Sequence, residues 1–516
     1  MSTTGFARPL MVGAASLFAS VSALLGQPAS NRPARPNVIV IYTDDQDRDQ
    51  LGCYGGAVKT PHMDSLARDG MRFTRFYAAS PVCTPSRYNV ISGRYASRSS
   101  RQQQKCPPGG PINIGWEAGV VGERILPQVL QAGGYVTGLA GKWHIGIDEE
   151  PAEMPIDADP NDPAIKQTLR ANYDKAVESI RRCGFDYVSS LYALNPGAGG
   201  KNPPPMFWLP KILQQHNMEW VAEGALEFIE QNHSRPFFLY VAPTLTHAPP
   251  ATDSLRSDPR ISTLGYLDTP PAAAPTRQEM LKQTGGLEPR QAAAVWLDAH
   301  VGAILRKLEE LGIADNTAVL LASDNGRNGK FCCYDGGART FMLARWKGVI
   351  PPGRVCEQLV SNVDLAPTIL DMCGIKPPAD YETDGQSIVP ALKATGDYRR
   401  DSVFLEITTE RAVVTDDGFK YIAVRYPPDI QKLIDAGKKY AHWCEPIEQS
   451  NTMGADKAFP GYFDQDQLYD LNADPNEQKN LTRDPKHRDR LDAMKKTLRD
   501  YSSRLPHQFG EFTTRR

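Results

Sequence analysis

The stretch Asn-Val-Ile-Val-Ile-Tyr-Thr at residues 37–43 decides the fold class of this 516-residue chain. A continuous apolar run of this kind is typical of a strand that is buried on both faces of a sheet. Similar runs recur at Tyr135–Ala140, Pro236–Ala242 and Thr317–Ser323, and helical patterns lie between them at Glu123–Ala132, Met218–Gln231 and Ala292–Leu311. Strands that alternate with helices predict an α/β fold with a large, mostly parallel sheet flanked by helices.

Two long stretches and a C-terminal region interrupt this pattern. Residues 148–210 and 248–286 are rich in turn-forming residues, and we expect irregular insertions there that shape the mouth of an active site. After about Pro390, short strand-like runs surround the turn Asp416-Asp417-Gly418, and a helix is expected over residues 486–502. This pattern of short strands followed by a helix predicts a smaller α+β subdomain at residues 391–516 with a short antiparallel sheet. It follows a catalytic domain at residues 31–390.

The first thirty residues have the pattern of an export signal. Arg8 precedes an apolar, small-residue stretch over residues 9–25, which is typical of a secretory signal peptide. A membrane anchor and a disordered start are the alternatives, but the apolar core is short for a spanning helix and lacks a flanking stop-transfer cluster. We therefore expect an exported protein, periplasmic or extracellular, without stable membrane insertion after cleavage of residues 1–30.

Charge and cysteine content exclude several classes of protein. The formal net charge is −2, so that no basic field indicates binding to nucleic acid or to an anionic membrane. Nine cysteines are too few for a disulfide scaffold in a chain of this length. Cys332 and Cys333 are adjacent, which leaves a bridge from one of them open, and the odd count leaves at least one thiol unpaired, for which Cys83 is the candidate.

Oxygen ligands follow two of the predicted strands. Asp44 and Asp45 come directly after the first strand, and Asp324 and Asn325 come directly after residues 317–323. Each pair alone is compatible with a solvated turn, and Asn-Gly is a common turn sequence. Because ligands gather at the carboxyl ends of strands in α/β sheets, the two pairs together predict a site for Ca²⁺ or Mg²⁺.

A cysteine stands at the expected start of a helix. Pro85 suits a first helical turn, which puts Cys83 at the helix entrance, where free N–H groups favour negative charge. Arg87 lies four residues on, on the same helical face, as a donor for an oxyanion. The segment alone is also compatible with a buried structural cysteine or with a phosphatase-like thiolate nucleophile.

The motif Cys83-x-Pro85-Ser86-Arg87, followed by Ser92-Gly93-Arg94, resembles the signature of type I, formylglycine-dependent sulfatases of the alkaline-phosphatase-like superfamily. Further elements that resemble those of the family occur in the expected order, at Thr60–Ala67, Gly141–Gly146, Thr246–Pro249 and Gly329–Arg339. The resemblance spans about residues 36–481. His62 and Asp335 depart from the family's Asn and Glu, and a short stretch before Lys330 makes the match of this lysine the weakest.

The resemblance implies the chemistry of the site. Cys83 would be oxidised to formylglycine by a formylglycine-generating enzyme, and a hydroxyl of its hydrate would attack sulfur to form a covalent sulfate intermediate. One Ca²⁺, with Mg²⁺ as the alternative, would be held by Asp44, Asp45, residue 83, Asp324 and Asn325. Arg87 would hold the hydrate, Lys142 and Lys330 would pair with sulfate oxygens, His144 would deprotonate the second hydroxyl, and His247 would protonate the leaving alcohol.

Two other functions are compatible with these motifs. One is a phosphonate or phosphate ester hydrolase of the same superfamily, and the other is a catalytically silent glycan-binding protein with unmodified Cys83. For the sulfatase reading, a sulfated oligo- or polysaccharide is the first candidate substrate, and a simple aryl or alkyl sulfate is the second.

Overall fold

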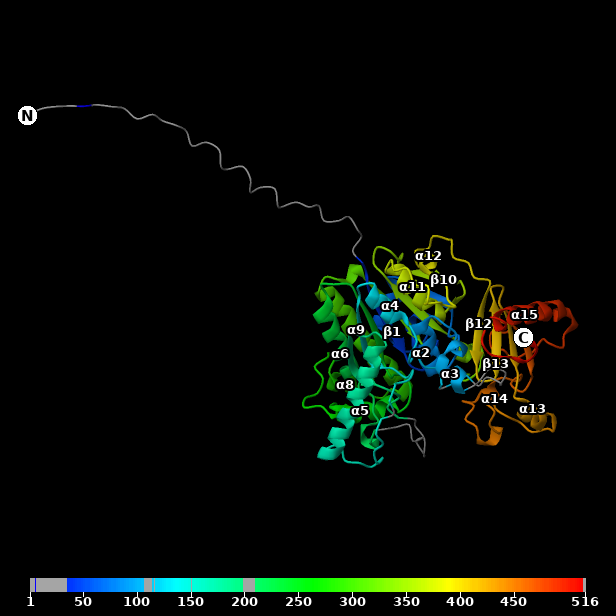
Figure 1. Cartoon of the computed structure of the whole chain (residues 1–516), viewed down its shortest axis with the longest axis horizontal. Helices are drawn as coiled ribbons and strands as arrows, with labels where there is room; N and C mark the ends of the chain where they lie inside the picture. Colours follow the sequence, from blue (N-terminus) through cyan, green and yellow to red (C-terminus); the bar gives the residue numbers. More distant parts are fainter. Residues whose placement is uncertain are drawn as a thin grey trace, which may run out of the picture. The chain divides into compact units, whose positions relative to one another are not determined.

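The computed structural model describes residue 5 and residues 35–105, 114–115, 117–149, 151–197 and 209–513. The predicted signal peptide and Cys106 lie outside these residues, apart from residue 5 of the signal. Contacts group Pro36–Arg516 into one compact unit, shown in Figure 1. No helix in the described ranges combines the length and the apolar character that a membrane crossing requires.

A large, mainly parallel sheet forms the centre of the α/β part. Its strands are β1 (Asn37–Thr43), β2 (Met71–Tyr77), β3 (Val136–Lys142), β4 (Tyr187–Tyr192), β5 (Phe237–Ala242), β8 (Thr317–Ser323), β9 (Arg339–Arg345), β10 (Arg354–Cys356) and β11 (Val360–Ser361). They lie in the order β10-β2-β9-β8-β1-β5-β3-β4, and β11 also pairs with β2. Only β9 runs against its neighbours β2 and β8, which leaves the other strands pointing the same way.

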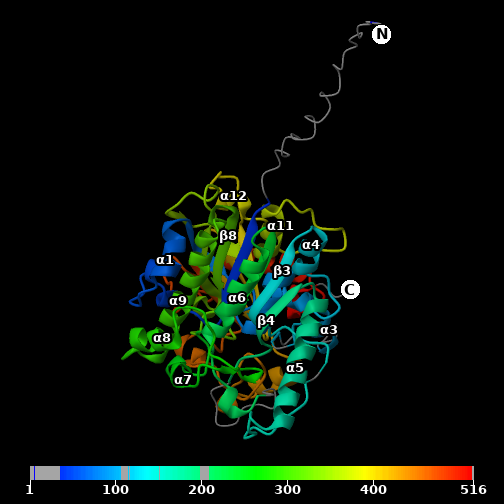
Figure 2. The same cartoon turned by 90° about the vertical axis from the view of Figure 1, so that its left-hand side faces the viewer.

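Helices cover both faces of this sheet (Figure 2). The helices of the α/β part are α1 (Pro61–Arg68), α2 (Cys83–Ser92), α3 (Ser100–Lys105), α4 (Leu126–Ala132), α5 (Pro163–Arg182), α6 (Met218–Asn232), α7 (Ala251–Arg256), α8 (Arg277–Thr284), α9 (Pro289–Glu310), α10 (Asp335–Ala338), α11 (Leu365–Met372) and α12 (Val389–Leu392). Alternate residues of β1 explain the two layers. Val38 and Val40 pack in one apolar core with residues of α2, α4 and α11, whereas Ile39 and Ile41 pack in the other with residues of α1, α6 and α9.

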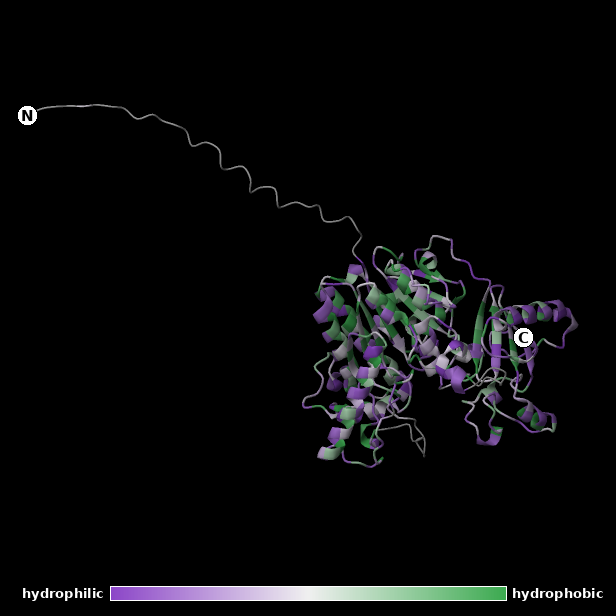
Figure 3. Cartoon of the chain, viewed as in Figure 1, coloured by the Kyte–Doolittle hydropathy of each residue, from purple (hydrophilic) through white to green (hydrophobic). Residues whose placement is uncertain are grey.

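The C-terminal region contains the predicted antiparallel sheet. Strands β12 (Ser402–Ile407), β13 (Glu410–Thr415), β14 (Phe419–Val424) and β15 (Asp466–Asp470) lie in that order. Short helices α13 (Pro428–Asp435) and α14 (Ala455–Ala458) occupy the connection between β14 and β15, and α15 (Arg488–Ser502) follows the sheet. In Figure 3, hydrophobic residues gather along the strands, and hydrophilic residues gather along outward-facing helices such as α15. The domain boundary at residue 390 stays a prediction.

The expected irregular insertion at residues 148–210 was wrong in part, because it contains α5 and β4. The side chain of Asp162 accepts N–H bonds from Ala164 (2.7 Å) and Ile165 (3.4 Å), and Pro163 occupies the first helical position, so the polar sequence here is a helix start. β4 then adds in parallel to β3. The second stretch, 248–286, likewise contains α7, α8 and a small ribbon of β6 (Ile261–Ser262) and β7 (Gly265–Tyr266).

Candidate active site

The carboxyl ends of β1 and β8 bring the two predicted pairs of oxygen ligands together. The strands pair in parallel with Thr43 opposite Ser323, so the residues that follow each strand lie side by side. The backbone of Asp45 has a φ of 54°, a left-handed conformation that turns the chain directly after the strand. Its N–H donates to Asp324 Oδ1 at 3.0 Å, which connects the two strand ends.

Cys83 begins α2 at this edge of the sheet and is fully buried. Its Sγ lies 3.3 Å from Asp44 Oδ1, 3.8 Å from Asp45 Oδ1 and 3.3 Å from Lys330 Nζ. Burial and the charge of Asp44 raise the pKa of this thiol well above its ordinary value. Cys83 is a free thiol, as expected, and so are Cys332 and Cys333. A protonated thiol therefore lies among the carboxylates. An oxygen atom at this position could bind the same metal ion as Asp44 and Asp45.

Each buried carboxylate has a cationic partner. Lys142 Nζ contacts Asp44 Oδ2, and Lys330 Nζ lies 2.7 Å from Asp45 Oδ1. Burial alone would raise the pKa of Asp44, but Lys142 and the neighbouring cations hold it well below its usual range. Two lysine ammonium groups thus lie against the carboxylates at this edge of the sheet.

Asp324 pairs with the arginine of the cysteine motif. Arg87 Nη2 lies 2.9 Å from Asp324 Oδ2 and 3.6 Å from Asp44 Oδ2, and its side chain is completely buried. Burial, and then the charge of Asp44, raise the pKa of Asp324 to about 7. Besides burial, the raised pKa reflects repulsion between the carboxylates of Asp324 and Asp44, and a divalent cation bound between them would remove this repulsion.

Two histidines border this centre. His247 Nε2 lies 3.8 Å from Asp45 Oδ2 and 3.2 Å from Asn195 Nδ2, and His247 Nδ1 lies 3.0 Å from the carbonyl oxygen of Ala248. That carbonyl can only accept, so Nδ1 carries the proton and Nε2 faces the centre. Burial lowers the pKa of His247.

His144 is buried, with a φ of 63°. Burial and the charge of Lys142 lower the pKa of His144 well below its ordinary value. The structure thus brings all of the predicted site residues to one edge of the sheet: Asp44, Asp45, Cys83, Arg87, Lys142, His144, His247, Asp324, Asn325 and Lys330.

The donor set fits a hard cation. Asn325 donates from Nδ2 to Asp45 Oδ1 at 2.7 Å, while its Oδ1 is buried without a hydrogen-bond partner. An unpaired buried acceptor costs stability unless something satisfies it. Ligand atoms of Asp44, Asp45, Cys83 and His247 lie within 4.8 Å of one another. The two carboxylates of this group suit Ca²⁺ or Mg²⁺, and Asn325 Oδ1 would add a neutral oxygen ligand.

Comparison with known proteins agrees with this geometry. Residues 36–375 match the family model Sulfatase, and residues 325–454 match the model N-sulphoglucosamine sulphohydrolase, C-terminal. The chain belongs to the sulfatase family. It is 29% identical to human arylsulfatase A over 493 residues, which covers 89% of this chain and 86% of the relative. It is 31% identical to human N-acetylgalactosamine-6-sulfatase over 393 residues, which covers 71% and 67%.

A solved structure concerned with the metabolism of multiple glycosaminoglycans by Bacteroides thetaiotaomicron has the same fold as this sulfatase. The TM-score is 0.63 at 20% identity, and the match covers 91% of this chain and 99% of the other. The predicted alkaline-phosphatase-like fold is confirmed, and so is the predicted enzyme class. This sulfatase is a sulfuric ester hydrolase.

Two site residues were missed by the sequence analysis. Asn195, which bonds to His247, follows β4, so a prediction of that strand would have pointed to it. The second is His216, which is buried. Its Nε2 lies 3.0 Å from the carbonyl oxygen of His247 and 3.0 Å from that of Pro249. Its segment before α6 carries no strand-end pattern, and nothing in the local sequence indicates this role.

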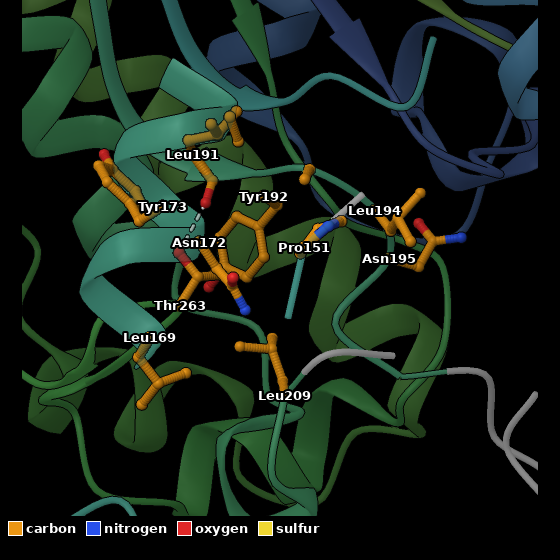
Figure 4. Close-up of a pocket in the computed structure, with 12 residues that line it drawn as sticks. Pro151, Leu169, Asn172, Tyr173, Leu191, Tyr192, Leu194, Asn195, Leu209 and Thr263 are labelled. Carbon is orange, nitrogen blue, oxygen red and sulfur yellow. Dashed lines mark hydrogen bonds between the residues drawn. The ribbon is translucent and has the colours of Figure 1, made fainter. Parts of the chain in front are cut away.

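An apolar pocket of the sulfatase lies beside Asn195 (Figure 4). Its walls come from α5, from the end of β4 and from two later loops. Tyr173, Tyr192, Leu209 and Thr263 are among the residues that line it. Because Asn195 both lines this pocket and bonds to His247, the pocket adjoins the histidine that faces the carboxylate centre.

Proposed function

We propose that this sulfatase is an exported enzyme that hydrolyses carbohydrate sulfate esters, with formylglycine made from Cys83 as the source of its nucleophile. The position of Cys83 Sγ, 3.3 Å from both Asp44 Oδ1 and Lys330 Nζ, is the observation that carries the proposal. A nucleophile at this point would contact both the carboxylates that would hold a metal ion and a cation that could bind the sulfate group.

The identity of the nucleophilic atom follows from the chemistry of its neighbours. The raised pKa of Cys83 keeps its sulfur protonated, and a hard cation has little affinity for a thiol. An oxygen at residue 83 removes both obstacles. A formylglycine hydrate supplies such an oxygen, together with a second hydroxyl through which sulfate can be released.

One Ca²⁺ would be held by Asp44, Asp45, Asp324, Asn325 and an oxygen at residue 83, with Mg²⁺ as the alternative. When bound, such a cation polarises the sulfate oxygens and the nucleophilic hydroxyl. The unpaired Asn325 Oδ1 supports this assignment, because it supplies the neutral oxygen that completes a set of carboxylates.

Cationic side chains would bind and orient the sulfate. Lys142, which contacts Asp44, and Lys330, which contacts Asp45, would turn toward sulfate oxygens when substrate enters. Arg87, fixed on Asp324 at 2.9 Å, would donate to the oxygens of residue 83. These donors stabilise the negative charge that develops during attack at sulfur.

The two histidines suit opposite proton transfers. The lowered pKa of His144 keeps its ring neutral, so it would accept the proton from residue 83 that accompanies sulfate release. His247 presents Nε2 to the site, and although burial lowers its pKa, Asp45 at 3.8 Å and an anionic substrate both act to raise it when substrate is bound. It would therefore donate a proton to the departing alcohol oxygen.

The substrate class is inferred from three observations. A relative of this chain is named N-acetylgalactosamine-6-sulfatase, and a structural neighbour comes from work on glycosaminoglycan metabolism. The apolar pocket beside Asn195 would pack against the apolar face of a sugar ring next to the sulfated unit. An aryl or alkyl sulfate is the second candidate for the same pocket.

Parallel assays on one preparation test the proposal. Sulfated oligosaccharides, aryl sulfates and phosphate monoesters and diesters are compared, while mass spectrometry measures the aldehyde fraction of the Cys83 peptide. We expect sulfate release from sugar esters by aldehyde-containing protein. Preferential hydrolysis of phosphate esters would favour the phosphoester hydrolase, and a fully retained thiol in native material would favour the glycan-binding alternative. Sequencing the N-terminus of the secreted protein tests removal of residues 1–30.

A further inference from the structure

A second group of metal-binding side chains lies outside the active site. It consists of Cys332 in the loop after β8, Glu410 at the start of β13 and His442 in the segment between α13 and α14. All three side chains are fully buried. One ligand atom from each lies within 4.8 Å of the others, although the residues come from three separate segments.

The contacts of His442 show how its ring is used. Its Nε2 lies 2.7 Å from the carbonyl oxygen of Tyr462, which can only accept, so Nε2 carries a proton. Glu410 Oε1 and Cys332 Sγ, the latter at 3.9 Å, both approach the other nitrogen, Nδ1. In a nucleophilic Cys-His-Glu triad the two partners would occupy different nitrogens. Convergence on one nitrogen excludes a triad and leaves a buried ion pair or a shared cation.

Neighbouring residues orient the side chains of Glu410 and His442. The N–H of Cys333 donates to Glu410 Oε2 at 2.8 Å, which leaves Oε1 directed at the cluster. The bond from His442 Nε2 to Tyr462 fixes the imidazole, and the Tyr462 ring stacks on it with centroids 4.0 Å apart. Histidine ligands in metal sites characteristically donate their second N–H to a carbonyl in this manner.

We propose that Cys332, Glu410 and His442 bind one Zn²⁺, with water as the fourth ligand. A thiolate, an imidazole and a carboxylate form a ligand set that zinc prefers and calcium does not. Binding takes Zn²⁺ from solution and releases the thiol proton of Cys332 to solvent, so the site changes no oxidation state.

The site would hold the active-site loop to the C-terminal sheet. Cys332 is two residues from Lys330, whose Nζ lies 3.3 Å from Cys83 Sγ, whereas Glu410 belongs to β13. A metal bond between these segments restricts movement of the loop that carries Lys330. The inference does not depend on the chemical state of residue 83.

Metal analysis of the full chain, prepared without a histidine tag, tests the inference. After equilibration with zinc and dialysis, we expect about one zinc per chain in the wild type. Cys332→Ser should bind zinc at least about 10-fold more weakly, and Glu410→Gln, which keeps the side-chain shape, should also weaken it. Cys333→Ser is the matched control, since Cys333 is equally buried and adjacent but offers no ligand atom to the cluster.

Cobalt gives an independent readout. Replacement of zinc by Co²⁺ should produce a thiolate-to-cobalt charge-transfer band in the wild type and in Cys333→Ser but not in Cys332→Ser, with folding of each variant checked by circular dichroism. A band that persists in Cys332→Ser would come from another thiol such as Cys83 and would overturn the assignment. Wild-type protein that binds neither metal, or that contains a Cys332–Cys333 disulfide, would overturn it as well.

Discussion

His216 offers a quantitative test of how the loop carrying His247 is held. Its buried ring lies between Thr244 Oγ1, 2.7 Å from Nδ1, and the carbonyl oxygens of His247 and Pro249, each 3.0 Å from Nε2. Nε2 therefore donates to the carbonyl oxygens, and in the neutral ring Nδ1 accepts from the Thr244 hydroxyl. Burial lowers the pKa of His216 from 6.5 to about 4.

The lowered pKa of His216 makes the free energy of unfolding depend on pH. Below pH 6.5 the unfolded chain takes up a proton at this histidine and the folded protein does not, so acidification stabilises the unfolded state. At about 1.4 kcal/mol for each pH unit, His216 should remove about 3 kcal/mol of unfolding free energy between pH 7 and pH 4. His216→Gln can keep the bond to the carbonyls but does not titrate. It should be about 1 kcal/mol less stable than wild type at pH 7 through loss of one hydrogen bond, the order should reverse between about pH 6 and pH 5, and the variant should be about 2 kcal/mol more stable at pH 4.

Urea unfolding of both proteins at pH 7, 6, 5 and 4 measures this difference. His233→Gln, which removes an exposed histidine, is the control for loss of a surface imidazole. A wild-type-minus-variant difference that stays constant across these pH values would refute the neutral, buried assignment of His216.

Three further substitutions test two other site residues and one buried ion-pair network. Arg87→Lys should lower kcat/KM about 100-fold or more, because one ammonium cannot replace the fixed guanidinium; an unchanged value in steady-state kinetics would contradict this role. His247→Gln should slow hydrolysis of sugar sulfates about 100-fold or more and nitrophenyl sulfate far less, since an activated leaving group needs no proton; equal losses on both substrates would exclude it as the acid. Lys420→Met should lower the unfolding free energy by about 3–5 kcal/mol, measured in urea, because it leaves the buried carboxylates of Asp335 and Glu477 without their shared cation; a loss below about 1 kcal/mol would show that the network is dispensable.

Much of the candidate active site could be predicted because the ends of the buried strands can be recognised in the sequence. The buried runs that became β1 and β8 are continuous and apolar, and the polar residues after them occupy the positions where parallel strands present ligands. The cysteine motif was placed correctly at the first residue of α2 because Pro85 marks a first helical turn.

The remaining features depend on contacts between distant segments. α5 was not predicted because most of its residues are polar, as in many surface helices. Asp162 and Pro163 nevertheless form a recognisable helix start. His216 acts through carbonyl groups about thirty residues away in the chain, and the cluster of Cys332 with His442 joins residues that are 110 positions apart. Neither arrangement leaves a local pattern, because backbone acceptors occur at every residue and only the folded chain selects which ones meet a side chain.

The most direct test of the account measures sulfate release against the chemical state of residue 83. Preparations with different degrees of Cys83 oxidation are made by varying coexpression of a formylglycine-generating enzyme, and the aldehyde fraction of each is determined by mass spectrometry. We predict that the rate of sulfate release from a sulfated oligosaccharide rises in proportion to that fraction and approaches zero for the pure thiol and for Cys83→Ala. A normal rate in either of these two proteins would contradict the claim that an oxygen nucleophile made from Cys83 carries the reaction.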